Sequence, residues 1–434
     1  MRRLFSPVDI APLVWLRLVF GGTMLWELWR VWHYGWIRAY WIAPTFHFKY
    51  HGFGSVEALP GNGMYYLFAM LALLALLTLV GCFYRISMVL FCVGYGYLFL
   101  IEQARFQNHF YLLCLLALLL ACVPAHRALS VDVWRNPVLR ASHAPAWTLW
   151  LLRAQIGIVY FYGGIAKLNG DWLGRAEPMR TFLRRRIDDP LVALIHDKEW
   201  VVYGMSYAGL LLDLAIEPLL MWRRTRWLAV VALVSFHLLN SRIFSIGVFP
   251  WFMLAVTPIF FEPGWLRSVL RRPPGEPGRM GRLSRPTVAL LAAYLLVQLV
   301  VPLRHFIQPG NVLWIEDGRL FSWHMKLHAK QAEGYFELTD PERGLTTRVD
   351  PRRLLPDWQV VRLLATPDMI LQFSHRLARE ARDQGIERIE VRAFITASLH
   401  GRPPQYLVDP TVDLAAERRP LWPARWIVPL ERGD

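Results

Sequence analysis

The stretch MYYLFAMLALLALLTLVG, residues 64–81, contains no charged side chain. An apolar run of this length is what an α-helix needs to cross the hydrocarbon core of a bilayer, about 20 residues. Similar runs recur along the chain up to about residue 302, and the whole chain is 55% hydrophobic and only 19% charged. This composition excludes a soluble globular enzyme, a disordered chain and a disulfide scaffold. It predicts a polytopic α-helical membrane protein.

Nine apolar runs are the predicted membrane spans, and together they define a transmembrane helical domain over residues 1–302. They cover residues 10–31, 64–81, 86–101, 106–123, 147–167, 200–221, 228–242, 245–262 and 286–302. The connection 32–63 is rich in Trp, Tyr and Phe with scattered His and Lys. That mixture is typical of an interfacial or re-entrant segment that lies at the level of the lipid head groups.

The pattern changes after residue 303. Two stretches alternate apolar with polar residues, as half-buried strands do: Phe321, Trp323, Met325 and Leu327, and then Ile389, Val391, Ala393 and Ile395. Between them, apolar residues recur at helical spacing over 370–381. They follow Thr366 and Pro367, which suit an N-cap and a first helical position, and Gly385 suits the helix end. We expect residues 303–434 to form a small α+β domain.

The basic residues predict the orientation. Arginines gather before the first span, in the loop 124–146, after residue 221 and in the loop 263–285, which contains Arg267, Arg271, Arg272, Arg279, Arg282 and Arg285. With nine spans these segments lie on one side, which is then cytoplasmic. The protein is predicted to lie in a bacterial inner membrane. Its N-terminus is then on the cytoplasmic side, and its C-terminal domain is outside, in the periplasm.

One predicted external loop, 168–199, is also basic and contains Arg175, Arg180, Arg184, Arg185 and Arg186. Either these arginines serve anionic ligands or lipid head groups, or one span is miscounted.

Two other kinds of site are not predicted. The net charge of +15 needs no nucleic-acid partner, because the arginines are accounted for by orientation. The four cysteines lack metal-ligand spacing, so no metal site is expected, and they suit small apolar packing residues. Only five of the 48 basic residues are Lys. Since Lys can lose its proton at useful pH and Arg cannot, each Lys is of more interest than an Arg.

Ionisable and amide side chains within the spans form the candidate site, because such groups are costly in a bilayer. In the predicted topology Asn108, His109, Lys167, His237 and Asn240 all lie at the outer side of the membrane. One shared pocket is therefore predicted there. A Lys partly buried in it would have its pKa lowered by desolvation and could act as a base.

Each of these residues also has a structural interpretation. Lys167 could extend to the head groups, and either histidine could serve helix packing. Asp213 is expected to pair with an Arg or to cap a neighbouring helix. Gly163 and Gly164 are expected to allow close helix approach.

Several motifs resemble those of vitamin K-dependent gamma-glutamyl carboxylases. They are NHFYL at 108–112, VYFYGGIAKLNGDW at 159–172, LLLDLAIEPLL at 210–220, FHLLNSRIFSIGVFPWFMLA at 236–255 and PGNVLWIEDGRLFSWHMKL at 309–327. The resemblance covers roughly residues 5–330. It is closest to bacterial members that carry a horizontally transferred transmembrane domain.

The resemblance implies that the enzyme uses vitamin K hydroquinone, as phylloquinol or menaquinol, with O₂, CO₂ and a peptide glutamate. A lysine base deprotonates the hydroquinone, oxygenation yields a strongly basic alkoxide, and the glutamate carbanion captures CO₂ while the epoxide forms. Lys167 matches the base, and Asn108, His109 and His237 match residues near the quinone. Tyr160, Tyr162 and Asn240 are expected to bind the quinone as well.

The implied partners are a glutamate-containing peptide or protein and membrane lipids. A propeptide-binding region cannot be matched, so quinol oxidation is better supported than carboxylation of a particular protein. One alternative is a quinone- or lipid-linked enzyme of the same fold with other chemistry. Another is a non-catalytic transporter or scaffold, against which the absence of inverted sequence repeats argues.

Overall fold

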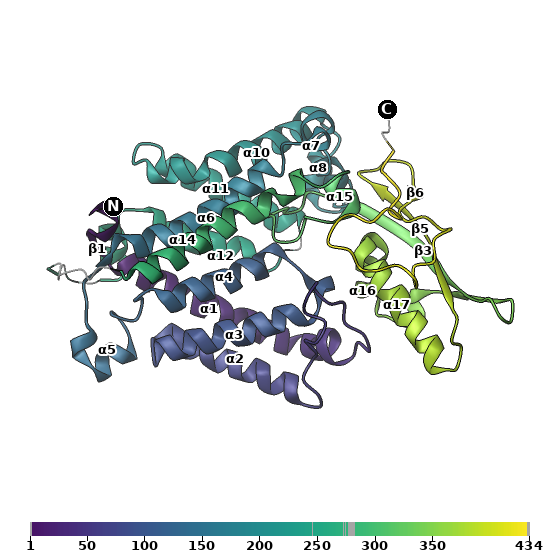
Figure 1. The fold of residues 1–434 in the computed structure, drawn as a ribbon. Helices are drawn as coiled ribbons and strands as arrows, with labels where there is room; N and C mark the ends of the chain where they lie inside the picture. The colour runs from purple at the N-terminus through teal and green to yellow at the C-terminus, as the bar shows by residue number, and fades with distance from the viewer. Residues whose placement is uncertain (1, 245, 272, 274, 277–282, 432–434) are drawn as a thin grey trace.

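The computed structural model of the chain describes residues 2–244, 246–271, 273, 275–276 and 283–431. Arg272, Arg279 and Arg282, which belong to the basic loop predicted as cytoplasmic, lie outside the described residues. Most of the described chain is helical, and a smaller sheet-containing domain follows at the C-terminus (Figure 1).

Helices occupy the predicted apolar runs. They are α1 (Ala11–His33), α2 (Gly63–Val80), α3 (Tyr84–Ile101), α4 (Asn108–Cys122), α6 (Ala146–Ile165), α10 (Glu199–Met221), α11 (Arg226–Ile243), α12 (Phe249–Val256) with a 3-10 turn at Thr257–Phe260, and α14 (Arg285–Val300). Among the described helices, four are long and apolar enough to cross a membrane: α2, α3, α10 and the segment Arg285–Phe306. The chain is an integral membrane protein.

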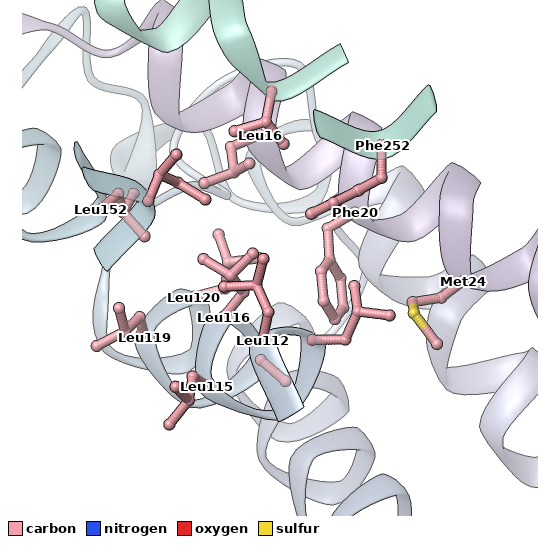
Figure 2. Packing of buried hydrophobic residues seen from close by; sticks show 14 of the residues in the cluster. Leu16, Phe20, Met24, Leu112, Leu115, Leu116, Leu119, Leu120, Leu152 and Phe252 are labelled. Carbon is pink, nitrogen blue, oxygen red and sulfur yellow. The ribbon is translucent and has the colours of Figure 1, made fainter. Parts of the chain in front are cut away.

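The long helices lie alongside one another in a bundle (Figure 1). Helix α1 packs against α2 and α12, α3 packs against α4, and α10 packs against both α6 and α11. Figure 2 shows the centre of this packing, where Phe20 of α1 and Phe252 of α12 face leucines of α4, including Leu112 and Leu116. At the end of the bundle near the N-terminus, β1 (Pro7–Asp9) pairs antiparallel with β2 (His143–Pro145), and β1 contacts α13 (Pro263–Val269).

Glycines of α6 set its distance from α10. A Cβ on Gly164 would lie 2.6 Å from Leu214 Cδ2, and one on Gly157 would lie 1.8 Å from Glu217 Oε2. At Gly164 the contact includes the Leu214 backbone nitrogen at 3.2 Å, so a larger residue there would push α10 away, whereas at Gly157 the flexible Glu217 side chain could move aside. The close approach of α10 to Gly163 and Gly164 brings Asp213 of α10 beside the end of α6.

The C-terminal domain is an antiparallel sheet with two helices on one face (Figure 1). The strand order is β4 (Leu345–Val349), β3 (Lys330–Asp340), β5 (Glu390–Leu399), β6 (Gln405–Tyr406), and Phe336 of β3 pairs with both Val349 and Ala393. Helices α16 (Asp357–Ala365) and α17 (Pro367–Asp383) cover the sheet, and the ring of Phe373 lies 5.0 Å from that of Phe336. The predicted helix with Thr366 as N-cap and the predicted strand at 389–395 are confirmed.

The strand predicted over 321–327 is wrong. After the single-turn helix α15 (Val312–Ile315), residues 316–329 form turns and irregular backbone. Within this segment Phe321, Trp323 and Lys326 have φ of 61°, 59° and 52°. Left-handed residues cannot continue a strand. The alternation of apolar residues reflects burial alone, since Trp323 and Leu327 are buried.

This turn-rich segment and two other loops join the domain to the bundle. Gln359 of α16 donates to Glu102 at the end of α3 (2.7 Å), and Gln372 of α17 accepts from the Lys49 amide (2.8 Å). The loop 166–198 contains three short helices, α7 (Gly170–Arg175), α8 (Met179–Arg184) and α9 (Pro190–Ile195), and Arg402 pairs with Asp171 at 2.6 Å. The domain thus covers the bundle end where α4 begins and where α6 and α11 end (Figure 1).

Candidate active site

A cavity of about 650 Å³ lies where the C-terminal domain meets the bundle. Its walls come from α4, α6, α10, α11 and the turn-rich segment, with apolar side chains such as Val159, Leu212 and Phe236 lining much of it. Six of the seven residues predicted from the sequence to bind or act on the quinol line this cavity: Asn108, His109, Tyr160, Lys167, His237 and Asn240. An apolar space with a few convergent polar groups is the usual form of a small-molecule site.

Lys167 lies just after the end of α6, where the chain turns back into the protein. Its Nζ donates to the Gly163 carbonyl (2.9 Å) and lies 2.5 Å from Oδ2 of Asp213. The side chain is only 5% exposed, so the predicted alternative of extending to the lipid head groups does not hold. The indole ring of Trp172 lies 5.3 Å from Nζ and closes the site from the loop side.

The prediction that Asp213 pairs with an Arg or caps a helix is wrong. Its partner is Lys167, and the carboxylate is 3% exposed. A buried ion pair must satisfy both charges internally, because neither group reaches water. The pair therefore fixes the ammonium group at one point of the cavity wall.

His237 of α11 meets Tyr160 of α6 across the cavity. The Tyr160 hydroxyl lies 3.0 Å from His237 Nε2, while His237 Nδ1 is buried without a protein partner. Buried polar atoms without partners are rare in proteins and point to a missing ligand atom or water. This nitrogen can bond a polar group of a molecule in the cavity.

Asn108 and His109 begin α4 and reach the cavity from the opposite side. Asn108 donates to the His324 carbonyl (3.0 Å), and its own Oδ1 is buried without a partner. His109 makes a ring contact with Phe249 (centroids 5.7 Å apart). Asn240 contributes its side chain from the last turn of α11. Together with His237, these residues supply the polar atoms that the two oxygens of a hydroquinone would need, inside apolar walls that suit its ring.

Tyr162 does not join this group, and its predicted contact with the quinone finds no support in the structure. It lies on another face of α6, where its hydroxyl donates to the Leu299 carbonyl of α14 (2.5 Å). With 3.6 residues per turn, positions 160 and 162 of one helix cannot face the same wall.

The opposite end of the cavity is basic, and the sequence analysis missed it. Arg319, Lys326, Lys330 and Arg362 line it together with His328. Burial lowers the pKa of Lys330 to about 8 and that of His328 to about 3, so at neutral pH Lys330 is mostly charged and His328 is neutral. Arg319 pairs with Glu316, whereas the Arg362 side chain makes no hydrogen bond or ion pair with the described residues. The buried Glu316 carboxylate acts on Arg319, Lys330 and Arg362 together, so positive groups outnumber negative ones at this end of the cavity. A surplus of positive charge favours an anionic ligand.

Arg319 and Arg362 also line a second cavity of about 390 Å³, on the far side from Lys167. Tyr50, Gln103 and Asp317 contribute to its wall. The two arginines thus lie between the cavity that holds Lys167 and this second cavity.

Contacts in the structure account for some of the arginines in the basic loop 168–199. Arg175 lies 3.6 Å from Asp171, Arg180 pairs with Glu199, and Arg186 donates to the Ile243 carbonyl (3.2 Å). Arg185 lines the main cavity. One arginine of the loop therefore adds to the positive charge around the cavity, while others hold the loop in place.

One feature of the sequence could have predicted the basic end of the cavity. In a chain where 43 of 48 basic residues are Arg, three of the five lysines, Lys167, Lys326 and Lys330, line one cavity.

Two family models match the chain. Residues 5–265 match the HTTM domain, and residues 283–433 match the vitamin K-dependent gamma-carboxylase lumenal domain. No solved structure matches the chain. The matched ranges cover both the helices that hold Lys167, His109 and His237 and the segment that supplies the basic end of the cavity. The chain belongs to the vitamin K-dependent gamma-carboxylase family.

Proposed function

We propose that the protein is a vitamin K hydroquinone-dependent gamma-glutamyl carboxylase that forms the quinone epoxide, with Lys167 as the base. The observation that carries this proposal is the buried Lys167–Asp213 pair in a cavity that also has a basic end. When bound, the hydroquinone supplies the reducing equivalents that react with O₂ and drive removal of the glutamate γ-proton. The two ends of the cavity suit the two reactants.

The cavity fits a hydroquinone in shape and in chemistry. Asn108 Oδ1, which can only accept, and His237 Nδ1, whose role depends on the tautomer, are buried without partners among the described residues. Val159 and Phe236 provide apolar surface for the ring. Apolar walls also exclude water, which protects a strongly basic species from being quenched. Asn240 and Tyr160 would complete the polar shell.

Lys167 must be neutral to accept a proton. Because Asp213 Oδ2 lies within hydrogen-bond distance, the ammonium proton can pass to the carboxylate and leave a free amine at the same position. Both partners are then uncharged, which burial favours. The amine can take a proton from a phenolic hydroxyl brought within reach, as general base catalysis requires. Arginine in this position would be unable to do so.

The basic end of the cavity suits the carboxylate of the second substrate, a glutamate in a peptide or protein. Arg362 makes no hydrogen bond or ion pair with the described residues, although the Glu316 carboxylate is near enough to act on its charge, and Lys330 retains its charge at neutral pH. A glutamate side chain bound there would place its γ-carbon toward the cavity centre, where CO₂ would also enter.

We further propose that all nine apolar helices cross the membrane, with the transmembrane domain at 1–302 and the external domain at 303–434. In this topology the N-terminus is cytoplasmic and the C-terminal domain is periplasmic in a bacterial inner membrane. Helix α14 supports it, because most of its apolar surface is exposed. Reaction of single introduced cysteines with a membrane-impermeant thiol reagent tests it. Position 353 should react from the periplasmic side and position 140 should not.

The function is tested with purified protein, reduced vitamin K, ¹⁴C-bicarbonate and a glutamate-containing peptide. We expect both quinone epoxide and acid-stable ¹⁴C in the peptide from the unaltered protein and from Lys198→Ala, which removes an exposed lysine. Lys167→Ala should form neither product. Epoxide without labelled peptide would indicate a quinol enzyme with different chemistry. Absence of both products in the unaltered protein would refute the proposal.

A further inference from the structure

A third hollow lies on the outer surface of the C-terminal domain, away from Lys167. It has a volume of about 810 Å³ and is bounded by the loop 45–57, α17 and residues 415–419. Its basic lining residues are Lys49, Arg379, Arg382, Arg418 and Arg419, and its acidic ones are Glu57 and Glu417. We call this hollow the basic groove.

Most of the positive charge in the basic groove is not neutralised by the protein itself. Lys49 pairs with Glu57 (2.9 Å) and Arg419 pairs with Asp368 (2.5 Å). Arg379, Arg382 and Arg418 are exposed and make no ion pair or side-chain hydrogen bond with the described residues. Three free guanidinium groups around one concave surface produce a positive potential that is concentrated in the groove.

The basic groove is connected to the active site through shared side chains. Arg419 lines both the groove and the second cavity, and it bonds the Lys49 carbonyl (2.7 Å) at the border between them. The second cavity in turn shares Arg319 and Arg362 with the cavity that holds Lys167. The basic groove, the second cavity and the reaction site are therefore neighbours that share arginines in their walls.

We propose that the basic groove binds an acidic stretch of the polypeptide substrate, adjacent to the glutamate that enters the active site. The identity of the bound chain as substrate rests on the proposed carboxylase function. Charge complementarity supplies orientation and faster association, since each exposed ion pair is weak alone. A chain with several acidic residues would engage several of these arginines at once.

The lining favours a polypeptide over a lipid surface. A membrane-binding face presents exposed apolar anchors beside its basic residues. Here the only large apolar lining residue is Phe46, which is partly buried and lies 5.1 Å from the Arg376 guanidinium. The groove is also hollow rather than flat, and residues of α17 form one of its walls.

The test is direct binding, which needs no turnover. A fluorescein-labelled peptide with one acceptor Glu in an Asp-rich sequence is titrated with the full-length protein in neutral-lipid nanodiscs, and fluorescence anisotropy is followed. A peptide with Asn in place of each Asp is the ligand control. The variant is Arg379→Glu/Arg418→Glu. The matched control is Arg353→Glu/Arg388→Glu, which makes the same charge change at exposed arginines outside the groove.

We expect the groove variant to bind the Asp-rich peptide at least roughly tenfold more weakly, and the control variant to bind it nearly as the unaltered protein does. Added salt should reduce the difference, because exposed charges are screened. Equal binding by both variants would overturn the proposal. Peptide binding that is unaffected, together with loss of binding to vesicles of anionic lipid, would assign the groove to the membrane and also overturn it. If the peptide binds in the groove but is never carboxylated, the proposed function fails and the groove assignment stands.

Discussion

Lys167 Nζ and Asp213 Oδ2 lie 2.5 Å apart, buried between the end of α6 and the middle of α10. The two residues are 46 positions apart in the chain, and Gly163 and Gly164 allow the helices to approach closely enough for the contact. The proposed function depends on this pair, because Asp213 holds Lys167 in the cavity wall and can accept its proton.

Asp213→Asn should abolish most of the activity. Without the carboxylate, Lys167 loses the group that positions its Nζ and accepts its proton, so we expect epoxide formation to fall by about 100-fold or more. The variant should also be less stable by about 3–5 kcal/mol, because a buried charge loses its partner. The measurements are the initial rate of epoxide formation and denaturation in detergent. The double variant Lys167→Met/Asp213→Leu should recover stability but not activity; recovery of activity would contradict the role of the pair.

His237→Ala should weaken use of the quinol more than use of the peptide. His237 bonds Tyr160 and has a free Nδ1, and loss of a bond to the quinol costs about 1.4 kcal/mol, or tenfold in KM. Tyr160→Phe should have a smaller effect in the same direction. Tyr162→Phe is the matched control, because this hydroxyl bonds α14 instead. A larger effect from Tyr162 than from Tyr160 would show that the quinol binds elsewhere.

The affinity for the peptide should depend on pH through Lys330. Burial lowers the pKa of its ammonium group to about 8, so Lys330 is charged below that pH and loses its charge as the pH rises through it. If Lys330 binds the glutamate carboxylate, KM for the peptide rises above about pH 8, and Lys330→Arg removes this rise because Arg stays charged. KM for the quinol, measured in the same series, is the internal control. Identical pH profiles for both proteins would exclude Lys330 from carboxylate binding.

Stability should also depend on pH through Asp317. Burial, with help from Asp368 and Glu316, raises its pKa from 3.8 to about 6. The folded protein then binds this proton more tightly than the unfolded chain, so its contribution to stability declines as the pH rises from about 4 to about 6. The difference in stability between Asp317→Asn and the unaltered protein should therefore be more favourable to the variant at pH 7 than at pH 4. Thermal denaturation at the two pH values measures this difference. The exposed Asp383→Asn should show no such change, and a similar gain there would contradict the assignment to Asp317.

Much of the fold follows from the sequence because the decisive forces are local. Apolar runs such as 64–81 must form helices in a bilayer, and the periodicity of 370–381 after Thr366 and Pro367 defines α17. The five residues that were grouped from their positions in the spans, Asn108, His109, Lys167, His237 and Asn240, all line one cavity.

The remaining features depend on contacts between distant residues. The partner of Asp213 could not be predicted, because it is set by glycine packing of α6 on α10. Residues 321–327 were wrongly predicted as a strand because alternation reports burial and not backbone handedness, and Phe321 and Trp323 have left-handed backbones. The basic end of the cavity was missed because Lys326 and Lys330 reach the cavity that Lys167 lines only through the tertiary path of this segment.

The most direct test of the central claim is the rate of epoxide formation by Lys167→Arg. Arginine keeps the positive charge beside Asp213 but does not lose its proton in a protein. We predict that this variant stays folded and binds reduced vitamin K, while its epoxide formation falls at least about 100-fold. Epoxide formation at the rate of the unaltered protein would contradict the assignment of Lys167 as the base.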